Sequence, residues 1–159
     1  MNSDIYILKS QYEWVKQSRK ILFKYCSTII DTDLLKENST FSRGSIRNLL
    51  VHIANTYEFW IGNRYLNKEI SFTKYESIVT INDVKSLFSE VDALVAEFLN
   101  DMVKHDRNEI EIEYKGEKML VEPFKLFTHV ITHEFHHKGQ ILSFSRHLGY
   151  TPVDTDIMR

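Results

Sequence analysis

The sequence is poor in residues that cross-link or interrupt a chain. Its 159 residues include one cysteine, two prolines and five glycines. The single cysteine, Cys26, excludes an internal disulfide bond, which agrees with a reducing compartment, and its spacing among apolar residues predicts a core position. No internal repeat or low-complexity segment stands out, so fibrous and repetitive architectures are excluded.

Neither charge nor hydropathy points to a nucleic acid or a membrane as a partner. Lysine and arginine total 20 against 22 acidic residues, a formal net charge of −2, and the basic residues are scattered along the chain. This distribution argues against nucleic-acid binding, which needs a basic stripe. No apolar run approaches the length of a membrane span, and the first residues lack the basic and apolar regions of a signal peptide. We therefore expect no membrane association and a cytoplasmic location.

The residues that are present suit one globular domain over residues 1–159. Hydrophobic residues make up 43% of the chain and charged residues 26%. These are the proportions of a folded protein, and a chain of this length can bury most of the surface that it exposes when unfolded. We expect one core and no second domain.

Apolar residues recur at helical spacing in four segments. These cover about residues 4–30, a stretch capped by Ser42 or Ser45 that runs to about 66, a stretch opened by Asn82-Asp83 that lasts about five turns, and 123–149. Polar turn residues predict a loop after the first segment, residues 67–81 look irregular, and an extended tail follows Gly149.

Residues 109–122 follow a different rule, because apolar and charged residues alternate around Lys115-Gly116. Alternation of this kind predicts a short β-hairpin. Together with the four amphipathic helices it predicts an all-α fold, a four-helix bundle with the hairpin inserted before the last helix.

Two histidines interrupt the apolar face of the last predicted helix. On a helical wheel of about 100° per residue, His133 and His137 fall on one side with five apolar residues: Leu126, Val130, Ile141, Phe144 and Leu148. A buried imidazole is costly unless its ring nitrogens find partners. Histidines at i and i+4 project side by side, as in pairs that bind a metal ion.

His52 supplies a third ligand from the second predicted helix, at the edge of its apolar arc. Helical bundles build metal sites from side chains on facing helices. Three imidazoles that leave the fourth position to water have the ligand count of a catalytic zinc site. The sequence therefore predicts one divalent ion held by His52, His133 and His137, although such ligands would also accept nickel, copper or iron.

Other interpretations of these histidines remain open. Residues 133–137 formally match the H-E-x-x-H motif of metalloproteases, but no later histidine or glutamate continues that motif. Glu134 could still orient a ligand or act as a base. His129, His136 and His147 are expected to lie in the outer shell or face solvent, and His136 is the least certain of them. A bundle whose histidines pair with buried polar groups, with no metal, is the remaining alternative.

Two stretches of the sequence, one around His133 and His137 and one around His52, resemble motifs of a known family. Residues 133–141 (HEFHHKGQI), followed by 146–149 (RHLG) and a tail with a proline, resemble the end of DinB/YfiT-like proteins, and residues 49–53 (LLVHI) with Glu58 and Trp60 resemble their second-helix motif. Lys138 stands where arginine is commoner. The resemblance implies an up-down-down-up four-helix bundle with zinc or nickel on three histidines, which by motif are His52, His133 and His137. It also implies activation of a low-molecular-weight thiol, in thiol S-transferases or isomerases, while other members are named hydrolases.

Two classes of function follow from these patterns. The first is a metal-dependent enzyme, a thiol S-transferase or a hydrolase, in which the ion activates a water or a small-molecule thiol. The second is a non-catalytic, stress-responsive protein that sequesters or senses a metal or small ligand. The tail after Gly149 and the loop of residues 41–45 are candidate pocket walls, and the sequence identifies neither the substrate nor any catalytic residue.

The last helix has a second apolar stripe opposite His133. It consists of Phe124, Ile131, Phe135 and Leu142. A helix with two apolar faces packs against two layers, so we expect a homodimer with this helix near the interface. Gly139 lies in mid-helix, where it costs about 1 kcal/mol relative to alanine, and this predicts a close approach of backbone or ligand.

Overall fold

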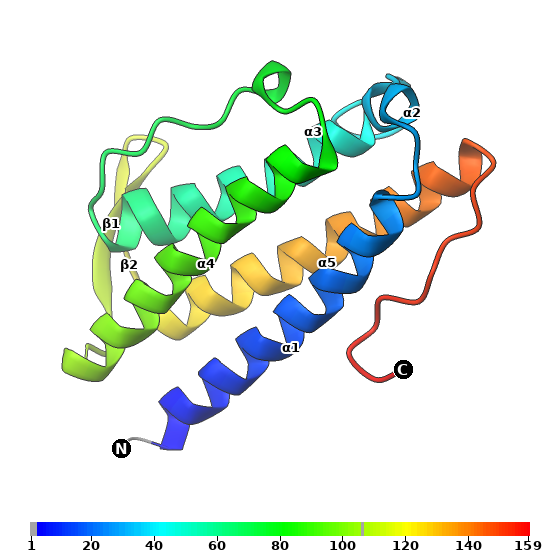
Figure 1. Ribbon diagram of the computed structural model, residues 1–159. Helices are drawn as coiled ribbons and strands as arrows, with labels where there is room; N and C mark the ends of the chain where they lie inside the picture. The colour runs from blue at the N-terminus through cyan, green and yellow to red at the C-terminus, as the bar shows by residue number, and fades with distance from the viewer. Residues whose placement is uncertain (1–2, 106) are drawn as a thin grey trace.

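The computed structural model describes residues 3–105 and 107–159 and forms the predicted four-helix bundle (Figure 1). The four long helical segments are α1 (Ser3–Cys26), α3 (Ile46–Tyr57) continued by the π-helix η1 (Glu58–Tyr65), α4 (Ile81–Lys104) and α5 (Pro123–His147). In Figure 1, α1 and α5 run in one direction and α3 and α4 in the other, which is the up-down-down-up arrangement. Because α3 and α4 are parallel, the chain must return along the bundle between them. Residues 66–80 make this return, and their predicted irregularity is confirmed apart from the 3₁₀ turn η2 (Tyr75–Ser77).

The helix caps explain where the middle helices begin. Ser45, one of the two predicted caps, accepts a hydrogen bond from the backbone N–H of Asn48 at 3.1 Å. The prediction that Asn82-Asp83 opens the next helix is wrong by one or two residues. Thr80 is the cap of α4, and Asp83 lies in the first turn and completes a capping box with it. This box satisfies two backbone N–H groups that the first turn leaves without partners.

The first predicted helix is also too long. α1 ends at Cys26, and α2 (Asp31–Leu35) forms one further turn of helix where a loop was predicted. The polar residues of this segment hide its helical signal, but Leu34 is only 1% exposed. Burial of one leucine against the bundle thus stabilises a turn that propensity alone would not.

A π-helix interrupts the regular winding of the second predicted helix. η1 buries Glu58, Ile61 and Gly62 toward the bundle. A Cβ atom on Gly62 would overlap the end of the Ile70 side chain, so the return segment packs directly on this turn. The wider winding cannot be read from a 3.6-residue period, although π turns are frequent near functional sites.

The predicted hairpin is confirmed. β1 (Ile110–Tyr114) pairs antiparallel with β2 (Glu117–Val121), with Ile110 opposite Val121 and Tyr114 opposite Glu117. Lys115 and Gly116 have φ angles of 55° and 81°. Two left-handed residues make the tight turn whose twist matches that of the strands.

The second apolar stripe of α5 is only partly covered by this chain. Phe124 is 54% exposed, whereas Ile131, Phe135 and Leu142 are partly buried and packed against the core. The homodimer stays a prediction, which sedimentation at equilibrium would check. Within the described residues, no helix combines the length and the apolar character that a membrane span requires.

Candidate metal centre

The fold brings the three predicted metal ligands together. His52 lies on α3, and His133 and His137 lie one turn apart on α5, which packs against α3. One ring nitrogen from each lies within 4.8 Å of the others. The Nε2 atoms of His52 and His133 are 3.1 Å apart. An ion at the usual Zn–N distance of 2.0–2.1 Å with tetrahedral geometry would set its ligand nitrogens about 3.3 Å apart, so the cluster is already near the required size.

One ring nitrogen in this cluster lacks the partner that burial requires. The Nδ1 atom of His137 lies 2.7 Å from Oε1 of Gln140, which assigns the ring proton to Nδ1 and leaves a lone pair on Nε2. That Nε2 atom is buried and has no hydrogen-bond partner. An unpaired buried acceptor is costly, and a divalent cation at the centre of the cluster would satisfy it. The residues therefore fit a metal ion, with Gln140 fixing the tautomer of one ligand.

The ligand set is neutral and incomplete. In the part of the chain that the structure describes, no fourth histidine, cysteine or carboxylate joins the group. His52 and His133 are only half-buried, so solvent or a small molecule can reach them. Three protein ligands with an accessible fourth position are typical of catalytic zinc sites, whereas structural sites are closed by four.

Burial keeps these imidazoles in the form that binds a metal. Loss of solvation, with smaller effects from Arg43 and the neighbouring histidines, lowers the pKa of His52 to about 3. Burial likewise lowers the pKa of His133 to about 4 and moves that of His137 below its ordinary value. The three rings are thus neutral at about pH 7, and neutral imidazole is the ligand.

Comparison with known proteins identifies the family of this chain. The sequence model of the DinB family matches residues 1–159. The chain belongs to the DinB family. Its sequence is also 27% identical over 151 residues to "Uncharacterized protein YizA" of Bacillus subtilis (strain 168), an alignment that covers 93% of this chain and 91% of that protein. The family resemblance seen in the histidine motifs is therefore confirmed over the whole chain.

The lowered histidine pKa values move the pH window of metal binding in this DinB-family chain. An ordinary histidine would lose metal between about pH 8 and 5. Because a buried ring takes up a proton only below its lowered pKa, we expect zinc affinity to fall at lower pH than it would for ordinary histidines, with the last losses near pH 4 and 3, where His133 and His52 take up protons. Equilibrium dialysis against zinc, with circular dichroism at each pH to confirm folding, would measure this. A loss centred near the ordinary histidine pKa would contradict the buried, neutral rings.

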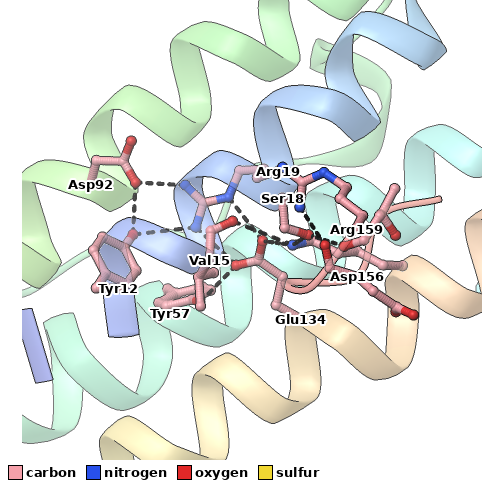
Figure 2. Close-up of polar contacts among 11 residues, drawn as sticks. Tyr12, Val15, Ser18, Arg19, Tyr57, Asp92, Glu134, Asp156 and Arg159 are labelled. Atoms are coloured by element: carbon pink, nitrogen blue, oxygen red, sulfur yellow. Dashed lines mark hydrogen bonds and ion pairs between the residues drawn. The ribbon is translucent and has the colours of Figure 1, made fainter. Parts of the chain in front are cut away.

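Glu134 does not take the role of a base at the histidines. Its side chain is fully buried and accepts hydrogen bonds from Arg19 at 2.8 and 3.0 Å and from Tyr57 at 2.7 Å, and its ion pair with Lys138 spans 3.0 Å. Figure 2 shows the carboxylate turned toward α1 and Tyr57. Burial raises the pKa of Glu134, but Arg19 and Lys138 outweigh it and lower the pKa to about 2. The metalloprotease interpretation fails on this geometry, because its glutamate must face the metal.

Sequence reasoning missed the network around Glu134. Arg19 also donates to Asp92 at 2.6 Å, and Asp92 accepts from the Tyr12 hydroxyl at 2.7 Å (Figure 2). A second branch runs from Lys138 to the Ser18 hydroxyl at 2.9 Å, which in turn donates to the carbonyl of Thr155 in the tail. Two signals could have revealed it. Arg19 interrupts the apolar stripe of α1, and Glu134 and Lys138 are spaced i and i+4.

The other histidines of α5 lie outside the group of three, as expected. The ring of His129 is centred 5.6 Å from that of His133 and 5.4 Å from Trp60. His136 contacts the amide of Gln140 at 3.2 Å, and His147 contacts Asn38 at 3.1 Å. All three are exposed. None is placed as a ligand of the ion that the other three histidines could bind.

Among the described residues no backbone approaches Gly139, so that half of the expectation from sequence is wrong, and the approach of a ligand stays a prediction. A Cβ atom built there meets nothing within 4 Å among the described residues. We expect Gly139→Ala to stabilise the metal-free monomer by about 0.5–1 kcal/mol, because alanine restricts the unfolded chain and favours the helix. Urea unfolding would measure the change. Destabilisation or weaker metal binding would instead show that a ligand or a second chain approaches this position.

Proposed function

We propose that this DinB-family protein is a metal-dependent enzyme that holds zinc or nickel on His52, His133 and His137 and acts on a small thiol or on water. A thiol S-transferase or a hydrolase is the class that this proposal implies. One observation carries it. The buried Nε2 atom of His137 has no partner, and it belongs to a cluster of three neutral imidazoles with no fourth protein ligand among the described residues.

The neutral ligand set supports chemistry rather than storage. A divalent ion on three imidazoles is a Lewis acid that lowers the pKa of a water or thiol in its open position. No carboxylate of the described residues joins the group, so these three ligands would neutralise none of the charge of an ion. Gln140 engages the Nδ1 atom of His137, which leaves Nε2 as the nitrogen that the ring can offer to an ion.

The missing base favours a thiol over water as the group that is activated. Glu134 is engaged with Arg19, Tyr57 and Lys138 and cannot take a proton at the histidines. A free thiol has a pKa near 8.5, far below that of water, so it needs less help to ionise. The DinB resemblance implies the same class of substrate.

Metal analysis of the wild-type protein is the first test. The protein is purified without a tag and without added metal, and its metal content per chain is measured by plasma mass spectrometry. We expect close to one zinc or nickel ion per chain. No metal, even after reconstitution, would contradict the proposal.

Thiol transfer is the second test. The metal-loaded protein is mixed with 2-mercaptoethanol and the electrophile 1-chloro-2,4-dinitrobenzene, and conjugate formation is compared with that of chelator-treated protein. Metal-dependent turnover supports the enzyme. Binding of thiol to cobalt-substituted protein without turnover of any thiol or ester substrate would favour the non-catalytic alternative.

A further inference from the structure

Arg43 places a positive charge beside the three histidines. It lies in the connection between α2 and α3, and its side chain is exposed. Its Nη2 atom is 3.4 Å from Nε2 of His52. The guanidinium therefore lies beside His52, whose ring also contacts His133.

The backbone of Arg43 is held in an uncommon conformation. Its φ angle is 68°, in the left-handed region that favours glycine, and Gly44 follows at 83°. The carbonyl of Arg43 accepts a hydrogen bond from Nδ2 of Asn48 at 2.8 Å, and the carbonyl of Gly44 accepts one from the N–H of Asn38 at 2.6 Å. A non-glycine residue keeps such a conformation only where its surroundings enforce it. The loop thus fixes the backbone of Arg43 beside α3, the helix that carries His52.

The charge of Arg43 is not balanced by the protein. Within the described residues, no carboxylate lies within ion-pair distance of it, whereas Arg19 has both Asp92 and Glu134. The Nε2 atom that faces Arg43 is also the atom that His52 would offer to a metal. If the lone pair on Nε2 of His52 binds a cation, it can no longer accept a hydrogen bond from Arg43. The N–H groups of the guanidinium are then free to donate to a different acceptor.

We propose that Arg43 forms an anion-binding subsite beside the metal and orients a substrate that carries an oxyanion, such as a carboxylate or sulfonate, next to its metal-binding group. This inference rests on the proposed function and names its substrate class. A guanidinium matches a planar or tetrahedral oxyanion with two parallel hydrogen bonds. Neutral ligands, a divalent cation and an unpaired arginine together leave the site strongly positive, which favours such an anion.

The test compares two short thiols, one that ends in an anionic sulfonate and one that ends in a neutral hydroxyl. The cobalt-substituted protein is titrated with 2-mercaptoethanesulfonate and with 2-mercaptoethanol, and binding is followed by the cobalt d–d and sulfur-to-cobalt absorption bands. The sulfonate group itself is a weak metal ligand. A difference in affinity between the two thiols therefore reports a contact with the protein and not chelation of the cobalt ion. We expect Arg43→Gln to weaken binding of the sulfonate about tenfold, the cost of one hydrogen bond to a charged group, and to change binding of the neutral thiol less than about twofold.

Two further variants make the result specific. Arg43→Lys keeps the charge without the bidentate geometry and should recover part of the sulfonate affinity. Arg146→Gln removes an exposed arginine near the C-terminal end of α5 and should leave the binding affinity of both thiols unchanged. The subsite alone would be overturned if Arg43→Gln protein still binds cobalt and either loses the same affinity for both thiols or loses no affinity for 2-mercaptoethanesulfonate. Failure of wild-type protein to bind cobalt, or of either thiol to perturb its spectrum, would overturn the thiol function together with it.

Discussion

Glu134→Gln should lower the free energy of unfolding by about 3–5 kcal/mol, the largest stability effect that the structure predicts for a single substitution. Glu134 is the common partner of Arg19 and Lys138, whose side chains are only 4% and 2% exposed. Glutamine keeps the shape of the side chain but removes its charge, so the buried Lys138 would lose its counter-ion and Arg19 would keep only Asp92. A buried charge without a counter-ion is among the most destabilising changes that a mutation can make.

Urea unfolding of metal-free protein, followed by circular dichroism, would measure this effect. Glu13→Gln is the matched control, because Glu13 pairs with Lys16 on the surface, with side chains 59% and 34% exposed. An exposed pair of this kind contributes about 0–1 kcal/mol. If both variants unfold at similar urea concentrations, the buried network does not stabilise the bundle as proposed.

The pH dependence of this effect follows from the pKa of Glu134. Its value is lowered from 4.5 to about 2 in the folded protein. A lowered carboxyl pKa contributes stability that is present above the unfolded value and is lost as pH falls toward the folded value. The difference between wild type and Glu134→Gln should therefore be full at neutral pH and should shrink below about pH 4.5.

Replacing any one of His52, His133 or His137 by alanine should weaken metal binding by more than about 100-fold, which exceeds the usual effect of changing an outer-shell partner. Each residue would supply one of the three ligands that the described part of the chain brings together. Removing one leaves two imidazoles, too few for a stable site in solution. Competition with a chelating indicator would give the affinities, and metal content per chain would confirm them.

Two control variants show whether the loss of metal affinity depends on how close the changed residue is to the histidine cluster. Gln140→Ala removes the hydrogen bond to Nδ1 of His137 and should cost about 10- to 100-fold. His147→Ala removes an exposed histidine that contacts Asn38 and should change nothing. Equal affinities in all of these variants would show that the metal binds elsewhere or that the histidines only fill the core.

The buried network and the histidine cluster lie on neighbouring faces of α5. Glu134 follows His133 directly, and Lys138 follows His137, so each of these two histidines has a network residue beside it. Arg19, Asp92 and Tyr57 come from α1, α4 and the end of α3. The network therefore joins all four helices and fixes the rotation of α5, which in turn directs His133 and His137 toward His52.

The sequence by itself determined the helices, the hairpin and the three histidines. Each of these leaves a local signal, because helices and strands repeat with fixed periods and an i, i+4 pair must share one face of a helix. The Lys115-Gly116 turn and Pro123 at the start of α5 are equally local. The helix ends were predicted less exactly. The turn of helix at Leu34 depends on the burial of that side chain, and the start of α4 depends on capping by Thr80, and periodicity reports neither.

Only the tertiary structure decided which polar groups meet. A helical wheel shows that Glu134 lies off the face that carries His133 and His137. It does not show that Arg19 and Tyr57 lie next to Glu134 and donate hydrogen bonds to it. It likewise cannot place Arg43, which is brought to His52 by a left-handed loop. Contacts between segments distant in the chain depend on how helices are rotated and packed against one another, and no period within a single segment contains that information.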